Sequence, residues 1–166
     1  MFSILGTIAS VRTIRVLTGL EAKVKWPNDV MANGKKIGGI LAEQVKDKII
    51  IGIGLNVNTR KFPEELSQQA SSLFLQHCKE LDKNQFLDLL LEEFDQLYLV
   101  VKKDKFGDIQ EEWESFSETV GREVKVVTSS GELKGKAIGL GEKGELILET
   151  ADGKIVKINS GDVFDA

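Results

Sequence analysis

The sequence is poor in the residues that build disulfide frameworks and metal centres. It contains one cysteine, Cys78, and one histidine, His77, among 166 residues. A single cysteine excludes an intrachain disulfide, and one cysteine with one histidine cannot supply a Cys- or His-based metal site. We therefore favour a reducing compartment, the cytoplasm, and interpret His77 as a surface residue near a helix end.

An excess of basic charge and long apolar runs are also lacking. The 22 Lys and Arg residues are outnumbered by 26 Asp and Glu, which gives a formal net charge of −4. Because no basic stripe can neutralise phosphates, we expect no nucleic-acid partner, although a local cationic pocket is compatible with this balance. No apolar run approaches the roughly 20 residues that span a bilayer, and the start carries no signal-peptide cleavage pattern, so we expect no membrane association.

The first two thirds of the chain predict helices packed on an antiparallel sheet. Apolar residues recur at three- and four-residue steps in the helical segments and alternate with polar residues in the first strand. Gly19 is placed to end the first helix, Asp82 begins another with Gln85 completing a capping box, and Asn33-Gly34 predicts a tight hairpin. The expected elements are helices over 2–17, 82–101 and 106–116, and a meander of three strands over 22–26, 35–45 and 49–57.

Beyond Phe116 the pattern changes to short strands separated by turns that contain glycine. Evenly spaced short strands of this kind are typical of a small barrel. We therefore predict an α+β chain with a boundary near Thr119, in which residues 1–118 form the sheet with helices and residues 119–166 form a small all-β barrel. The strands expected in the second part cover 123–128, 132–140, 145–149 and 154–158.

The segment from Lys25 to Lys36 combines features that suit an anionic ligand. A strand-like opening runs into Pro27-Asn28-Asp29, which can turn the chain and present an amide and a carboxylate. The chain then extends, folds back and returns with two adjacent lysines. We expect Lys36 to face the site and Lys35 to point to the opposite face, into solvent.

Four glycines follow on the return strand and the next one. Gly38, Gly39, Gly52 and Gly54 weaken strand interiors, so they indicate close approach of a ligand or of another backbone. Bulges in a strongly curved sheet explain them equally well. The residues by themselves leave both readings open.

Three motifs together resemble the successive central motifs of biotin protein ligases. They occur in the same order and at about the same spacing as in that family, and the similarity continues through the helical pair and a C-terminal SH3-like barrel. The resemblance implies a partial antiparallel sheet with helices, similar to class II aminoacyl-tRNA synthetases, followed by that barrel. The motifs are Lys25-Trp26-Pro27-Asn28-Asp29, Lys36-Ile37-Gly38-Gly39-Ile40-Leu41-Ala42-Glu43 and Gly52-Ile53-Gly54-Leu55-Asn56-Val57-Asn58.

The resemblance implies a two-step ligase reaction. The biotin carboxylate attacks the α-phosphate of MgATP to give biotinyl-5′-AMP and pyrophosphate, and a lysine amine of a biotin carboxyl-carrier protein then displaces AMP. Biotin, ATP and Mg²⁺ are the implied ligands, and the carrier domain is the implied partner. Some members of the family pair through sheet edges, so a homodimer is a further expectation.

The same resemblance assigns roles to individual residues. Lys36 matches the family's essential lysine, whose ammonium can bridge the biotin carboxylate and the α-phosphate. Asn28 and Asp29 match the nucleotide-binding Pro-Asn-Asp positions, where Asp29 supports Mg²⁺, orients Lys36 or caps the turn. Trp26, at the end of the first strand, either helps to wall the site or is a core residue, and we favour the core.

Three further positions are implied in ligand binding. Gly38 and Gly39 match the strand that lies along bound biotin, where the absence of side chains lets the backbone approach the ligand. Asn56 matches the family's asparagine near the nucleotide, so it is the remaining candidate for ATP binding.

Two family elements have no counterpart in the sequence. A Ser/Thr-Asn element and a Gly-Arg-Gly-rich closing loop are expected before the first helix, yet the single Gly-Arg pair is Gly121-Arg122. We therefore expect a truncated ligase, one part of a split ligase, or a remnant retained for binding. The helix-turn-helix of repressor-type members is also absent, so no operator binding is expected.

Two other functions compete with the biotin ligase reading. A lipoate–protein ligase has a related fold, a similar lysine and a carrier protein as its acceptor. The Lys-Trp-Pro-Asn-Asp signature and the barrel favour biotin. A non-catalytic module that holds a carrier protein or another subunit is the alternative outside enzymes. Because small barrels serve many functions, the barrel alone decides nothing.

Overall fold

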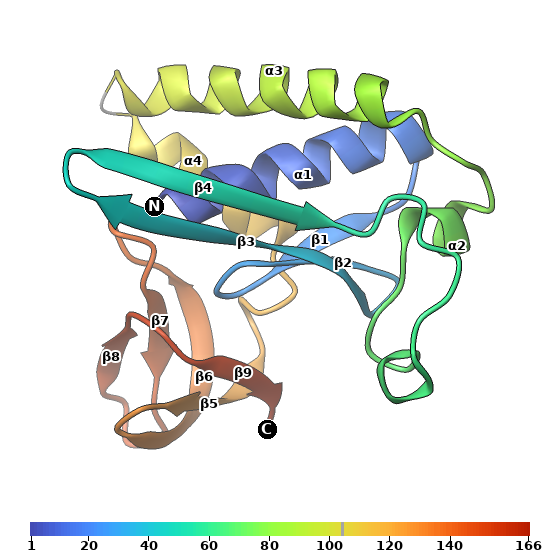
Figure 1. The fold of residues 1–166 in the computed structure, drawn as a ribbon. Helices are drawn as coiled ribbons and strands as arrows, with labels where there is room; N and C mark the ends of the chain where they lie inside the picture. Colours follow the sequence, from blue (N-terminus) through green and yellow to red (C-terminus); the bar gives the residue numbers. More distant parts are fainter. Residues whose placement is uncertain (104) are drawn as a thin grey trace.

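The computed structural model describes residues 1–103 and 105–166 and contains two antiparallel sheets, with the longer helices gathered on the first (Figure 1). The N-terminal sheet consists of β1 (Ala22–Lys25), β2 (Asp29–Ala32), β3 (Lys35–Val45) and β4 (Lys48–Leu55). The helices are α1 (Phe2–Thr18), α2 (Leu73–His77), α3 (Lys83–Val101) and α4 (Phe106–Phe116), with a short 3₁₀ turn at Glu64–Leu66.

The N-terminal sheet is a meander in the order β1-β2-β3-β4. It has four strands where the sequence predicted three. The prediction was wrong because Val30, Met31 and Ala32 are apolar and buried in succession, so β2 shows no alternation of apolar and polar residues. The predicted return strand and the strand after it are confirmed as β3 and β4, which pair from Gly38–Leu55 to Val45–Lys48.

Helix α1 covers one face of this sheet and is buried along most of its length. A Cβ atom on Gly6 would lie 3.0 Å from the Ile40 side chain, so the helix and β3 touch there. Gly19 ends α1 in the left-handed conformation, as predicted. Asp82 caps α3 by accepting from the backbone N–H groups of Asn84 and Gln85.

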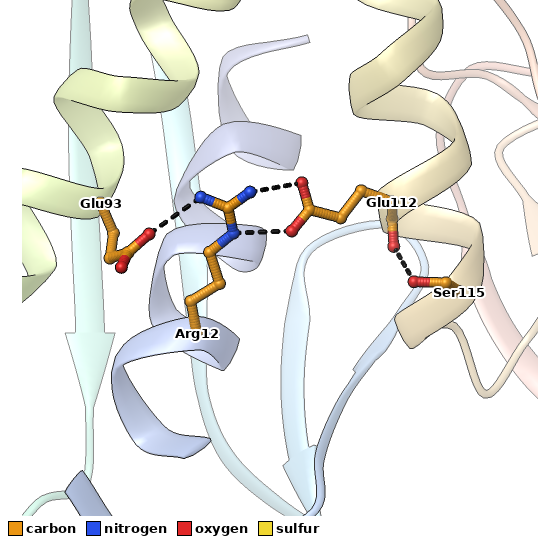
Figure 2. A network of polar contacts seen from close by, with 4 residues as sticks. All are labelled: Arg12, Glu93, Glu112 and Ser115. Atoms are coloured by element: carbon orange, nitrogen blue, oxygen red, sulfur yellow. Dashed lines mark hydrogen bonds and ion pairs between the residues drawn. The ribbon is translucent and has the colours of Figure 1, made fainter. Parts of the chain in front are cut away.

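A charged cluster joins the three long helices (Figure 2). Arg12 of α1 donates from Nε and Nη2 to the two carboxylate oxygens of Glu112 on α4, at 2.6 and 2.7 Å. Its Nη1 donates to Glu93 of α3 at 2.9 Å. This two-pronged geometry is the strongest arrangement of a guanidinium and a carboxylate, so Arg12 fixes the position of α4 relative to α1.

The C-terminal sheet consists of β5 (Glu123–Thr128), β6 (Gly131–Leu140), β7 (Leu146–Glu149), β8 (Ile155–Ile158) and β9 (Asp162–Asp165). Its order is β8-β7-β6-β5-β9, and in the part of the chain that the structure describes its two outer strands are not paired with each other. The expected small all-β unit is present, but as an open curled sheet rather than a closed barrel. Strand β9 escaped prediction because only Val163 of its four residues is buried.

Among the helices that the structure describes, none combines the length and apolar character needed to cross a bilayer.

Candidate functional site

The candidate site begins at the three-residue turn Trp26-Pro27-Asn28, which joins β1 to β2 and contains a cis Trp26–Pro27 peptide bond. Asn28 is fixed to β3 by two hydrogen bonds. Its carbonyl accepts from the N–H of Ile40 at 3.0 Å, and its side-chain Nδ2 donates to the carbonyl of Ile40 at 2.6 Å. The turn is therefore held against the sheet, and Asp29, the next residue, starts β2 from a fixed point.

A β-bulge sets which face Lys36 occupies. Met31 pairs with Lys36, but the neighbouring Val30 pairs with Gly38, so Ile37 is an extra residue in β3. In a regular strand, side chains three positions apart point to opposite faces, and an extra residue changes this parity. Lys36 accordingly lies on the same face as Gly39, where a Cβ atom would be 3.7 Å from the Lys36 Cε.

The bulge brings Lys36 against Asp29. Nζ of Lys36 lies 2.6 Å from Oδ1 of Asp29, and their side chains are 49% and 24% exposed. An ion pair this accessible contributes about 0–1 kcal/mol to stability, so its position matters more than its energy. An ammonium has three donors, and Asp29 occupies one direction while the others can reach a ligand.

Three glycines form a flat floor beside this ion pair. Gly39 pairs with Gly54, and Leu41 pairs with Gly52. The three glycines and Leu41 therefore lie on the face of the sheet that carries Asp29 and Lys36. A Cβ atom at Gly52 would come no closer than 3.9 Å to its nearest neighbour, and one at Gly54 no closer than 3.8 Å, which are ordinary van der Waals distances. Packing within the fold does not require these two glycines. Their effect is to keep the surface open.

The ion pair and the glycine floor line one shallow hollow of about 470 Å³. This volume lies within the usual range of small-molecule sites, roughly 300–1,000 Å³. The sequence had singled out Asn28, Asp29, Lys36 and Gly39, which all line it. The remaining lining residues are Ile40, Leu41, Gly52, Ile53 and Gly54.

The other two candidates lie elsewhere. Gly38 is buried, and a Cβ atom there would come 2.1 Å from the carbonyl oxygen of Gly54, so glycine is required by strand packing. Asn56 follows β4, where its N–H donates to Ile37 at 2.8 Å and its carbonyl accepts from Leu73 at 2.9 Å. Neither residue lines the hollow.

Lys35 points away from the hollow, as its position next to Lys36 predicted, but it is not free in solvent. Its Nζ donates to the carbonyl of Ser67 at 2.7 Å, and the residue is half-buried. The two adjacent lysines therefore differ: Lys35 holds a loop, and Lys36 faces the hollow.

Metal-binding groups are sparse at this surface. Within residues 1–103 and 105–166, no group of three or more His, Cys, Asp or Glu side chains is arranged to hold a metal ion. Of the residues that line the hollow, Asp29 alone carries a carboxylate. One carboxylate is compatible with an Mg²⁺ ion carried by phosphates, but not with a resident metal held by protein alone.

Comparison with known proteins gives a consistent result over the whole chain. Residues 1–58 match the biotin/lipoate A/B protein ligase family, and residues 119–164 match the biotin protein ligase C terminal domain. The bifunctional ligase/repressor BirA of Bacillus subtilis is 36% identical over 168 residues, covering 97% of this chain and 51% of that protein. The biotin–[acetyl-CoA-carboxylase] ligase of Mycobacterium tuberculosis is 31% identical over 160 residues, covering 96% of this chain and 59% of that protein.

Solved structures agree with the sequence comparison. Biotin protein ligase from Aquifex aeolicus superposes with a TM-score of 0.92 at 32% identity, covering 99% of this chain and 74% of that one. The same ligase in complex with biotin and ATP superposes with a TM-score of 0.88 at 33% identity, covering 98% and 69%. The present chain spans about half the length of the curated relatives that it matches.

Proposed function

Because this chain belongs to the biotin protein ligase family, we propose that its hollow binds biotin beside ATP and supports formation of biotinyl-5′-AMP, from which biotin passes to a carrier lysine. The observation that carries the proposal is the ion pair of Lys36 and Asp29, set at the edge of a floor without side chains. We also keep the division into residues 1–118 and 119–166 as part of the proposal.

The first step needs a cation between two anions. The biotin carboxylate oxygen attacks the α-phosphorus of ATP, the new P–O bond forms, and the bond to pyrophosphate breaks. Lys36 is placed to donate to the carboxylate and to an α-phosphate oxygen, which offsets their repulsion and stabilises the charge of the transition state. Its strand position fixes the ammonium before the ligands arrive.

Asp29 acts on Lys36 in this scheme. The 2.6 Å contact holds the ammonium over the hollow. Mg²⁺ enters as part of the substrate MgATP, and Asp29 is the carboxylate available to its water shell. Asn28 braces the turn through Ile40, so its contribution to ATP binding is through the position of the turn. The assignments of Gly38 and Asn56 to the site stay predictions from the family resemblance.

The glycine floor suits the apolar part of biotin. The alkyl chain and fused rings can lie on Gly39, Gly52 and Gly54, with Leu41 at the side. In the second step the amine of a carrier lysine attacks the acyl carbon, the acyl–phosphate bond breaks, and AMP leaves. The amine loses its proton to water or to AMP.

A lipoate ligase is the second candidate, because the family matched by residues 1–58 includes lipoate enzymes. The match of residues 119–164 to the biotin protein ligase C terminal domain favours biotin. Parallel incubations with biotin and with lipoate separate the two candidates. Biotin, and not lipoate, should protect the hollow from solvent and give an acyl-AMP.

The test of the proposed function is direct. The chain is incubated with MgATP and labelled biotin, biotinyl-AMP is measured, and a carrier domain is then added to read transfer. We expect adenylate from the parent chain and none from Lys36→Ala. Failure of the parent chain both to bind biotin and to form the adenylate would overturn the proposal.

A further inference from the structure

Trp26 ties the turn that carries Asn28 and Asp29 to the C-terminal part of the chain. Its indole Nε1 donates to the carbonyl of Gly144 at 3.1 Å, and its backbone N–H donates to Oγ1 of Thr119 at 3.1 Å. The side chain is buried, and both partners follow α4 in the sequence. A residue two positions before Asn28 is thus bonded to groups about a hundred residues away.

The carbonyl of Gly144 is itself held in place. The turn between β6 and β7 is closed by the N–H of Gly141 donating to the carbonyl of Glu145 at 2.7 Å and by the N–H of Gly144 donating to the carbonyl of Gly141 at 2.9 Å. The N–H of Lys143 donates to the Glu145 carboxylate at 2.8 Å. A Cβ atom on Gly144 would come 2.6 Å from Cδ1 of Ile4, so the turn abuts α1.

A second set of bonds fixes the same corner to α4. The N–H of Leu140 donates to Oε1 of Glu114 at 2.8 Å, and Nε2 of Gln110 donates to the carbonyl of Leu140 at 3.1 Å. The corner of the C-terminal sheet is therefore docked independently of Trp26. It can serve as a fixed reference for the indole.

The path from Trp26 to the hollow is short. Only Pro27 separates Trp26 from Asn28, and its ring fixes the φ angle, so a shift of Trp26 cannot be absorbed there by rotation about φ. Asn28 accepts from Ile40, and Asp29 contacts Lys36. A displacement at Trp26 therefore reaches the ion pair through two residues.

We propose that Trp26 is a positioning residue, which aligns the Asn28–Asp29 turn, and through it Lys36, against the docked corner of the C-terminal sheet. The effect on catalysis rests on the proposed function, whereas the effect on the turn does not. The C-terminal sheet contributes to the site in this way without lining the hollow.

The test compares two buried tryptophans whose indoles donate to different parts of the chain: Trp26 donates to the turn between β6 and β7. Trp113 is also fully buried, and its indole donates to Oγ1 of Thr7 at 3.2 Å, within the helical core. Replacement by Phe removes one indole hydrogen bond at either position. Amide hydrogen exchange of Ile40, whose N–H donates to Asn28, then reports opening of the turn. We expect about tenfold faster exchange in Trp26→Phe, relative to core amides of β5, and no relative change in Trp113→Phe.

A second variant keeps the test decisive if Trp26→Phe does not fold. Thr119→Val removes the acceptor of the Trp26 N–H while retaining the side-chain shape, and should also accelerate Ile40 exchange. Equal acceleration in the Trp26 and Trp113 variants, or none in Trp26→Phe and Thr119→Val, would overturn the inference.

Kinetics give the functional reading. In adenylate formation Trp26→Phe should lower kcat by about tenfold while KM for biotin changes little, because the ligand floor is untouched and the ammonium is misplaced. If the parent chain forms no adenylate, the proposed function fails, and exchange at Ile40 still decides the positioning role.

Discussion

Lys36 and Asp29 are in contact although they are not partners in the strand register. Asp29 pairs with Gly39 and Lys36 with Met31, yet Nζ and Oδ1 lie 2.6 Å apart because the extra residue Ile37 turns Lys36 toward Asp29. The contact belongs to the bulge rather than to either strand alone.

Replacing Lys36 should abolish function without unfolding the chain. We expect Lys36→Ala to lower kcat/KM for adenylate formation by about 10²–10³-fold, the usual cost of losing one transition-state donor. Because the ion pair is exposed, the free energy of unfolding should change by less than about 1 kcal/mol. Pyrophosphate release and urea unfolding measure the two effects. Lys35→Ala is the control, and a comparable loss of activity there would contradict the assignment of the two lysines.

Two glycines should respond to alanine in opposite ways. Gly38→Ala forces a Cβ atom to 2.1 Å from a carbonyl oxygen and should destabilise the fold by about 1–3 kcal/mol or more. Gly54→Ala meets no close atom, so it should leave stability unchanged and weaken biotin binding. Urea unfolding and calorimetric titration with biotin distinguish the two. Unchanged biotin affinity in Gly54→Ala would argue against the floor as the biotin surface.

The charged cluster of Arg12, Glu93 and Glu112 should contribute more to the free energy of unfolding than an exposed ion pair does. Arg12→Ala leaves the carboxylates of Glu93 and Glu112 without their guanidinium, and we expect a loss of about 1–3 kcal/mol in the free energy of unfolding. Arg60→Ala removes the exposed pair with Glu80, 62% and 63% exposed, and should cost less than about 1 kcal/mol. Equal losses in the two variants would mean that this cluster stabilises the fold no more than an exposed ion pair does.

Glu118 should make stability fall as the pH rises. Burial raises the pKa of its carboxyl above the usual 4.5, although Arg122, Lys25 and Lys23 oppose the shift. The folded state therefore holds the proton more tightly, and this contribution is present below pH 4.5 and is lost as the pH passes the raised value. Urea unfolding from pH 3.5 to 8 should show a smaller decline in Glu118→Gln than in the parent chain.

Glu145 provides the opposite sign for comparison. Hydrogen bonds from its own backbone N–H and that of Lys143 lower the pKa of its carboxyl. Its contribution is present above pH 4.5 and is lost as the pH falls through the lowered value, so Glu145→Gln should lose stability at neutral pH and not in acid. Parallel pH profiles for the Glu118 and Glu145 variants would refute both assignments.

The sequence predicted the parts of the fold that depend on local periodicity. Helices α1, α3 and α4, the Asn33-Gly34 hairpin and most of the C-terminal strands follow from spacing and turn residues, and the order of three motifs led to the family. The short strands β2 and β9 were missed because neither alternates: three of the four β2 residues are buried, and only one of the four in β9 is.

The geometry of the site could not be predicted from the sequence. A bulge is a relation between two paired strands, so the alternation along residues 35–39 alone does not place Lys36 beside Asp29. The four glycines looked alike in the sequence, but a clash with the Gly54 carbonyl explains Gly38, whereas a Cβ atom at Gly52 or Gly54 would meet its nearest neighbour at ordinary van der Waals distance. The hydrogen bond of Trp26 to Gly144 joins residues 118 positions apart and leaves no local signal.

That separation also has a consequence for the order in which the chain assembles. The residues that line the hollow all fall between Asn28 and Gly54, within hairpins whose loop closures are short and fast. Gly144 leaves the ribosome more than a hundred residues after Trp26. On a nascent chain the residues of the ligand surface are therefore all present before Gly144, and the bond from Trp26 can form only after the turn between β6 and β7 has been synthesised.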